Sequence, residues 1–167
     1  MIFTRICDAY ARFLHKLMLI LGLALIFAVT LQVLGRYVPF VPRFLWPLEL
    51  SNFTLIWLVF LGSILGLREK RHFTVDLFIG KKLSPWFNAF LKAVYYISVG
   101  VVTYIFIVYG YSYFKEWGLI QHSEITGISM GFLYFSVPLA GVSWALFLVE
   151  NIYYDLTGKN KVRENKA

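Results

Sequence analysis

The sequence predicts an all-α integral membrane protein in which four transmembrane helices form a single domain over residues 1–167. The first observation is a set of four uncharged apolar stretches of 19, 18, 22 and 25 residues, at positions 17–35, 50–67, 93–114 and 125–149. Each stretch can cross a hydrocarbon core about 30 Å thick, because a helix rises about 1.5 Å per residue. In lipid, a helix satisfies its own backbone hydrogen bonds. We therefore expect spans near residues 17–35, 48–67, 90–114 and 128–150.

The second observation is the distribution of Lys and Arg, which predicts the orientation. Of the 16 basic residues, all but Arg36, Arg43 and Lys115 fall in the N-terminal segment, the central connection or the C-terminal tail. Because Lys and Arg are retained in the cytoplasm, both termini and the central connection are expected to lie inside. This topology and anionic lipid headgroups account for the net charge of +7, so no nucleic-acid partner is expected.

Composition and motifs argue against an enzyme. Hydrophobic residues make up 59% of the chain and charged residues 15%, unlike a soluble domain. The single cysteine, Cys7, excludes an internal disulfide and disulfide-exchange chemistry. A haem anchor needs two histidines at ligand depth on facing helices, but His15 lies at the inner edge of the first span while His72 and His122 lie in loops on opposite sides. Since zinc-ligand spacing and a nucleophile–base pair are also missing from the sequence, we expect no catalytic, metal or cofactor site.

Residues 2–16 are predicted to form an amphipathic helix that leads into the first span. Apolar side chains recur there at helical spacing, opposite Arg5, Asp8 and Arg12. A position on the inner membrane surface is favoured, and docking of this helix onto a partner is the alternative. The length of the first apolar stretch favours an uncleaved signal anchor over a cleavable signal peptide.

The first outer connection, residues 37–47, contains three prolines and several aromatic side chains. The prolines exclude a simple helix, and the aromatic rings suit the membrane interface. Arg36 and Glu49 lie at similar depth on either side of it. Two interpretations stay open: an ion pair, within the chain or between subunits, or two side chains that extend separately to the headgroups.

The central inner connection is predicted to be a structured interfacial segment. Thr74 can cap a short helix, with Asp76 in its first turn and Gly80 at its end. The side chains of residues 77–79 would then enter the membrane interface. A role for Asp76 as a catalytic acid has little support, because no second ionisable group is placed to work with it.

The last span contains Pro138 near the middle of its apolar stretch. A proline at that position usually kinks a helix. A packing kink is favoured over a broken helix that lines a substrate site, because the other half of the chain has no equivalent break. The preceding outer connection, residues 115–124, is short and slightly acidic, and its sequence indicates little about structure or function.

The spans carry small and aromatic residues but no carboxylate at a helix centre. A self-sufficient ion-coupled carrier would be expected to place ionisable groups at the midplane. Small residues permit close helix approach, and the candidates are Gly22, Ala24, Ala28, Gly62, Ser63, Gly66, Gly100 and Gly110. These features favour a support subunit that contacts another protein. The alternative is a stand-alone small channel or lipid-interacting protein, which would change membrane permeability when reconstituted alone.

Over nearly its whole length, the sequence resembles the small, Q-type membrane subunit of the tripartite ATP-independent periplasmic (TRAP) transporters. The matching segments are residues 34–37, Trp46 with residues 49–50, residues 57–62, residues 67–76, and Pro138 in the last span. The most specific match is the basic-His-x-x-Val-Asp segment that contains His72 and Asp76. Leu48 departs from the pattern, since many members carry a second acidic residue there.

The resemblance implies a non-catalytic subunit of a sodium-gradient-driven importer in the cytoplasmic (inner) membrane of a bacterium or archaeon. Such a subunit pairs with a large membrane subunit that holds the substrate and sodium sites and moves in an elevator-like way. A periplasmic substrate-binding protein delivers a carboxylate, such as a dicarboxylate or a sialic acid. The small subunit would scaffold the large one and help dock the binding protein. No cofactor is expected in this chain, because sodium would bind the large partner subunit.

Candidate interface residues follow from position and from this resemblance. Those expected to contact the large subunit, another helix or lipid headgroups are Arg36 and Glu49 at the outer edge, and Arg68, Arg71, His72 and Asp76 at the inner connection. Those expected to help periplasmic docking are Glu116, His122 and Glu124.

Overall fold

The computed structural model describes residues 2–68 and 85–157. Its elements are α1 (Ile2–Tyr37), α2 (Trp46–Arg68), α3 (Pro85–Trp117), α4 (Gly131–Tyr134) and α5 (Ser136–Thr157). Four segments are long and apolar enough to cross a membrane, namely Arg5–Tyr37, Trp46–Arg68, Phe90–Trp117 and Gly131–Tyr153. The prediction of an all-α, four-span protein is confirmed. The predicted interfacial segment after the second span lies outside the described residues.

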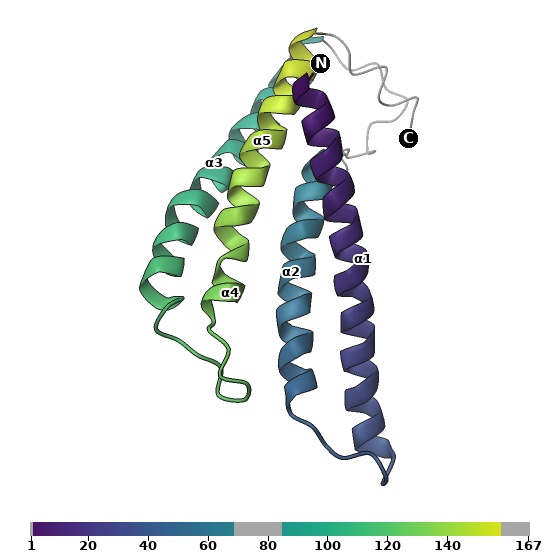
Figure 1. Ribbon diagram of the computed structural model, residues 1–167. Helices are drawn as coiled ribbons and strands as arrows, with labels where there is room; N and C mark the ends of the chain where they lie inside the picture. The colour runs from purple at the N-terminus through teal and green to yellow at the C-terminus, as the bar shows by residue number, and fades with distance from the viewer. Residues whose placement is uncertain (1, 69–84, 158–167) are drawn as a thin grey trace.

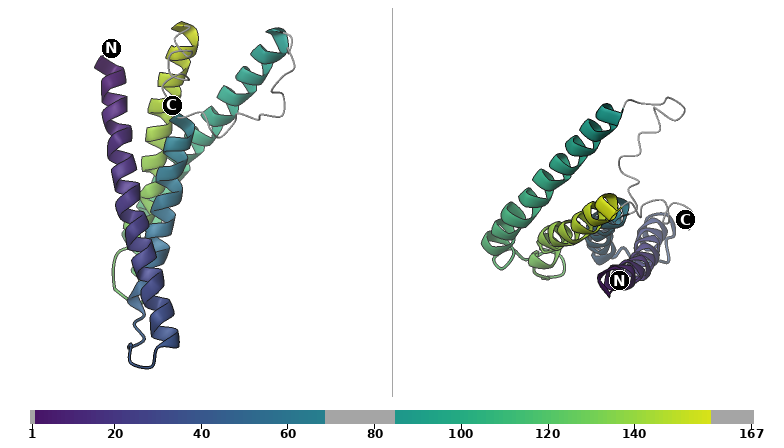
Figure 2. Two further views of the ribbon diagram at one scale, coloured as in Figure 1. Left: turned by 90° about the vertical axis from the view of Figure 1, so that its right-hand side faces the viewer. Right: turned by 90° about the horizontal axis from the view of Figure 1, so that it is seen from above.

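The helices lie in a curved row in the order α1, α2, α5, α3 (Figures 1 and 2). Within this row, α1 packs on α2, α2 packs on α5, and α5 packs on α3. Figure 2 shows that α3 diverges from the other helices toward its N-terminal end. Because α1 and α3 stand at the ends of the row, much of their apolar surface stays exposed, as at Leu23 and Ile26 of α1 and Ile97 of α3.

The N-terminal lead-in is an unbroken part of α1. This helix has 36 residues and is therefore about 54 Å long, well beyond the thickness of a hydrocarbon core. Cys7, Ala11 and Leu14 recur at helical spacing and are buried in the core, whereas Ile6 and Phe13 are exposed. The lead-in thus packs one face on the bundle and leaves the other for contacts outside the chain.

The core is concentrated where α1, α2 and α5 meet. Leu61, Ile64 and Leu67 of α2 and Phe147 of α5 are almost fully buried, and they pack with Leu14 of α1. This contact lies toward the end of the bundle where α1 begins and α2 ends. Polar groups at that end are therefore surrounded by apolar side chains.

Two glycines allow α3 and α5 to approach closely. A Cβ atom at Gly141 would lie 2.9 Å from Cγ1 of Ile107, and one at Gly110 would lie 2.8 Å from Cγ1 of Val137. Real Cβ atoms essentially never come so near a neighbour, because protein interiors are already close-packed. Gly100, also on α3, would meet nothing within 4 Å. Of the predicted small-residue contacts on this helix, Gly110 makes one inside the chain and Gly100 does not.

The last span is interrupted close to its start. α4 ends at Tyr134 and α5 begins at Ser136. Pro138 lies in the first turn of α5, where a missing backbone N–H is tolerated. The favoured prediction was a packing kink at Pro138 near the middle of the span; the regular helix is instead interrupted at Phe135, and Pro138 lies toward the start of the segment Gly131–Tyr153. The reason is that apolar residues 125–130 belong to the loop before α4 and not to a helix.

Candidate functional site

A polar cluster joins three helices at the end where α1 begins and α2 ends. Arg68, the last residue of α2, directs its guanidinium toward two carboxylates. Its Nε lies 3.4 Å from Oε2 of Glu150 in α5, and a terminal nitrogen contacts Oδ1 of Asp8 in α1. The guanidinium carbon is also 5.3 Å from the ring centroid of Phe147, a cation–π distance. One arginine therefore ties α1, α2 and α5 together.

Burial separates the two ion pairs of this cluster. The Glu150 side chain is fully buried and that of Arg68 is 12% exposed, whereas the Asp8 side chain is 57% exposed. A buried charge is costly unless it is paired, but an exposed ion pair contributes at most about 1 kcal/mol. Glu150 is therefore the principal partner of Arg68, and Asp8 closes the cluster at its rim.

Asn151 makes a second buried connection between α5 and α2. Its side chain is buried, and Nδ2 donates a hydrogen bond to the carbonyl oxygen of Leu67 at 3.2 Å. The last carbonyls of a helix have no partner within that helix. Two adjacent residues of α5 thus hold the end of α2. Glu150 pairs with the charge of Arg68, and Asn151 satisfies the carbonyl group of Leu67.

The sequence pattern pointed to Arg68 but not to Glu150 or Asn151. Arg68 directly follows the second apolar stretch, and Glu150 directly follows the last one, on the same predicted side. The pair could therefore have been predicted from the fact that Arg68 and Glu150 lie at the same depth in the membrane. The other residues predicted to organise this end, Arg71, His72 and Asp76, lie outside the described residues.

At the opposite end of the bundle, Arg36 and Glu49 do not form an ion pair in the structure. Glu49 is 7% exposed, and both of its carboxylate oxygens lack a hydrogen-bond partner among the residues that the structure describes. The guanidinium carbon of Arg36 instead lies 5.7 Å from the ring centroid of Tyr37. The polar contact between α1 and α2 at this level is neutral, since Gln32 Nε2 donates to Ser51 Oγ at 2.9 Å. The intrachain version of the predicted pair is absent, and pairing with another subunit stays a prediction.

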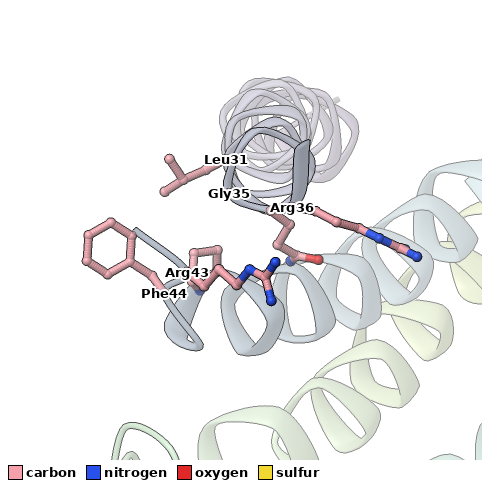
Figure 3. A pocket seen from close by; sticks show the side chains of 7 residues that line it. Leu31, Gly35, Arg36, Arg43 and Phe44 are labelled. Carbon is pink, nitrogen blue, oxygen red and sulfur yellow. The ribbon is translucent and has the colours of Figure 1, made fainter. Parts of the chain in front are cut away.

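A pocket of about 350 Å³ lies where α1 ends and α2 begins. Figure 3 shows that Arg36 and Arg43 come from different segments and that their guanidinium groups lie apart, with that of Arg36 extending away from Leu31 and Phe44. The lining residues are Leu31, Gln32, Gly35, Arg36, Arg43, Phe44 and Pro47. The pocket therefore combines two cations with apolar walls.

The second connection at this end is a folded loop whose predicted docking residues are exposed. His122 and Glu124 are exposed in this loop, and Glu116 is exposed in the last turn of α3, just before it. The backbone around them is ordered by an isolated antiparallel bridge between His122 and Ser129, and by Gly127 at φ +71°. An exposed, ordered loop is compatible with a docking role, and that role stays a prediction.

These features define a multi-pass membrane protein whose helices are organised by a buried charge cluster, with apolar faces left open on both sides of the row. Over residues 9–158 the chain matches the sequence model of the family described as tripartite ATP-independent periplasmic transporters, DctQ component. The chain belongs to this family, whose members are non-catalytic transporter subunits. The resemblance stated from the sequence is therefore confirmed.

Two curated relatives from Haemophilus influenzae (strain ATCC 51907 / DSM 11121 / KW20 / Rd) support this assignment. Each is described as a TRAP transporter small permease protein and is 29% identical to this chain, over 104 and 107 residues. The matched segments cover 62% and 64% of this chain. They span 63% and 64% of the relatives, just under two thirds of their length.

Proposed function

We propose that this chain is the small membrane subunit of a sodium-gradient-driven TRAP importer for a carboxylate substrate. It scaffolds a large transport subunit and helps a periplasmic binding protein to dock. The observation that carries the proposal is the family match over residues 9–158. Two relatives described as small permease proteins of TRAP transporters point in the same direction.

The arrangement of the helices supports a scaffolding role. They form a row in which α1 and α3 each stand at an end, so they do not close around a central space (Figure 2). Exposed apolar side chains follow the outer face of α1, including Leu19, Leu23 and Phe27. Such faces match lipid or the helices of a partner, and contiguous apolar surface beyond a few hundred Å² is typical of an interaction site.

The cluster around Arg68 supports a rigid scaffold. It holds the ends of α1, α2 and α5 through groups from three different helices. Packed cores and buried polar networks resist gradual deformation. A subunit with this internal cross-linking is suited to stay fixed while another subunit moves.

Sodium coupling, carboxylate transport and docking are assigned from the family and from the exposed outer loop. Glu116, in the last turn of α3, and Glu124, in the loop that follows, are exposed at the end of the bundle that the charge distribution places outside. Acidic rim residues would mainly alter the rate at which a binding protein associates. Substitution of both by Gln should therefore slow docking without loss of the membrane complex.

The proposal is tested by affinity purification of the tagged full-length chain from its native membranes in mild detergent, followed by mass spectrometry. A large polytopic subunit recovered in near-equal amount is expected. The purified assembly, reconstituted together with its periplasmic binding protein, should take up carboxylates only with an inward sodium gradient. Recovery of the chain alone, together with permeability of liposomes that contain only this chain, would instead support a stand-alone channel.

A further inference from the structure

The pocket at the α1–α2 turn carries two positive charges and no negative one. Arg36 and Arg43 are its charged lining residues, and no carboxylate of the described chain lines it. Neither arginine forms an ion pair with another described residue, and both side chains are exposed. Their guanidinium groups are therefore available to an anion from outside the chain.

The position of these arginines is unusual for the sequence as a whole. The end of the bundle that holds the α1–α2 and α3–α4 connections has three basic residues, of which the third is Lys115. Two of the three line this one pocket. Because basic residues are depleted on the side opposite the cytoplasm, two arginines at one pocket there indicate a site for an anion.

The backbone brings the two charges to the same pocket through Gly35. A Cβ atom at this position would lie 3.3 Å from the carbonyl oxygen of Pro42 and 3.7 Å from Cα of Arg43. The absence of a side chain lets the connecting segment fold back against the end of α1. The backbone of Arg43 therefore lies against Gly35, which directly precedes Arg36 in the chain.

The surroundings place the pocket at the level of lipid headgroups. Tyr37, Phe40, Phe44 and Trp46 flank it, and aromatic side chains are enriched at the membrane–water interface. Phe40 is almost completely exposed. A soluble anion has no apolar part to contact these side chains, whereas a phospholipid presents a phosphate next to apolar chains.

We propose that this pocket binds the headgroup of an anionic phospholipid in the adjacent leaflet. Guanidinium groups bind phosphate oxygens with strong, charge-assisted hydrogen bonds. Arg36 and Arg43 supply the positive charge that attracts the headgroup, while Leu31 and Phe44 contact the apolar part of the lipid. Because the two guanidinium groups lie apart (Figure 3), they are able to bind different oxygens of one headgroup.

The test counts lipids bound to the purified full-length chain by native mass spectrometry. Palmitoyl-oleoyl phosphatidylglycerol is compared with phosphatidylcholine of the same acyl chains, and glycerol phosphate is added as a soluble competitor. The wild type should retain phosphatidylglycerol preferentially, and glycerol phosphate should not displace it. The double variant R36Q/R43Q should bind phosphatidylglycerol roughly 30-fold more weakly.

The matched control is Lys115→Gln, which removes the third basic residue at this end without touching the pocket, and its lipid retention should equal that of the wild type. The variant R36K/R43K keeps both charges and should keep most of the preference. Equal retention of the two lipids by the wild type would overturn the proposal, and this comparison needs no variant to fold. Unchanged phosphatidylglycerol binding in R36Q/R43Q, or full displacement by glycerol phosphate, would overturn it as well.

Discussion

The Nε atom of Arg68, at the end of α2, lies 3.4 Å from Oε2 of Glu150 in α5, across 82 positions of the chain. The carboxylate is fully buried and the guanidinium nearly so. The ion pair therefore connects the two helical hairpins, α1–α2 and α3–α5, at one end. A contact of this kind favours one pairing of the faces of α2 and α5, because a slip of either helix would separate the guanidinium from a buried carboxylate.

Removing one partner of this pair should be more harmful than removing both. Arg68→Met removes the guanidinium that lies 3.4 Å from the buried carboxylate of Glu150, and should lower the free energy of unfolding by about 3–5 kcal/mol. The double variant R68M/E150M should lose less of its free energy of unfolding than R68M alone. Unfolding of the purified chain in mild detergent measures both. A double variant that is less stable than R68M would contradict the idea that the buried Glu150 charge carries a net desolvation cost.

Asp8 provides the matched control for that experiment. It contacts the same guanidinium but is 57% exposed. Asp8→Asn should therefore change stability by at most about 1 kcal/mol, since water screens an exposed ion pair. An effect as large as that of R68M would show that the rim pair carries more of the stability than its exposure suggests.

Charge reversal at the other end should give no rescue. Arg36 and Glu49 are not paired in the structure, so the double variant R36E/E49R should be no more active in transport than either single reversal. The neutral substitution Glu49→Gln should keep or raise the stability of the chain, because a buried amide costs less than a buried, unpaired carboxylate. Recovery of transport by the double reversal would show that the two residues pair in the assembled transporter.

The α3–α5 contact should be sensitive to a single methyl group at Gly141. The Cβ of an alanine there would lie 2.9 Å from Cγ1 and 3.0 Å from the backbone nitrogen of Ile107. Gly141→Ala should therefore destabilise the chain by about 1–3 kcal/mol through overpacking. Gly100→Ala is the control, because its Cβ meets nothing within 4 Å, and it should stabilise α3 by about 0.5–1 kcal/mol. Similar thermal unfolding of the two variants would argue against close approach at Gly141.

The hydrogen bond between Tyr10 and Ser143 should respond unequally to removal of its two partners. Ser143 Oγ donates to the carbonyl oxygen of Leu139 at 2.8 Å, so the Tyr10 hydroxyl, 2.7 Å away, is the donor to Ser143. Tyr10→Phe leaves no unsatisfied group and should cost about 0.6 kcal/mol. Ser143→Ala leaves the tyrosine hydroxyl without its acceptor and should cost more, about 1–2 kcal/mol. Equal losses on thermal unfolding would contradict this direction of donation.

Much of the architecture could be predicted from the chain because lipid imposes simple rules. A stretch such as residues 17–35 has to be a helix, since no other structure satisfies its backbone groups in hydrocarbon. The residues around His72 and Asp76 indicated the family, and that assignment is confirmed by the match over residues 9–158. The interruption at Phe135 was not predicted, because hydropathy does not separate the loop at residues 125–130 from the start of the helix that follows it.

The sequence by itself determined the class of protein, the number of spans and the family, because these depend on local composition and on short motifs. Only the tertiary structure decided the order of the helices in the row, the pairing of Arg68 with Glu150 and the burial of Glu49 without a hydrogen-bond partner among the described residues. The physical reason is that hydropathy gives the depth of a residue but not its direction around the helix axis. Two charges at equal depth meet only if their helices are neighbours and turn the right faces toward each other.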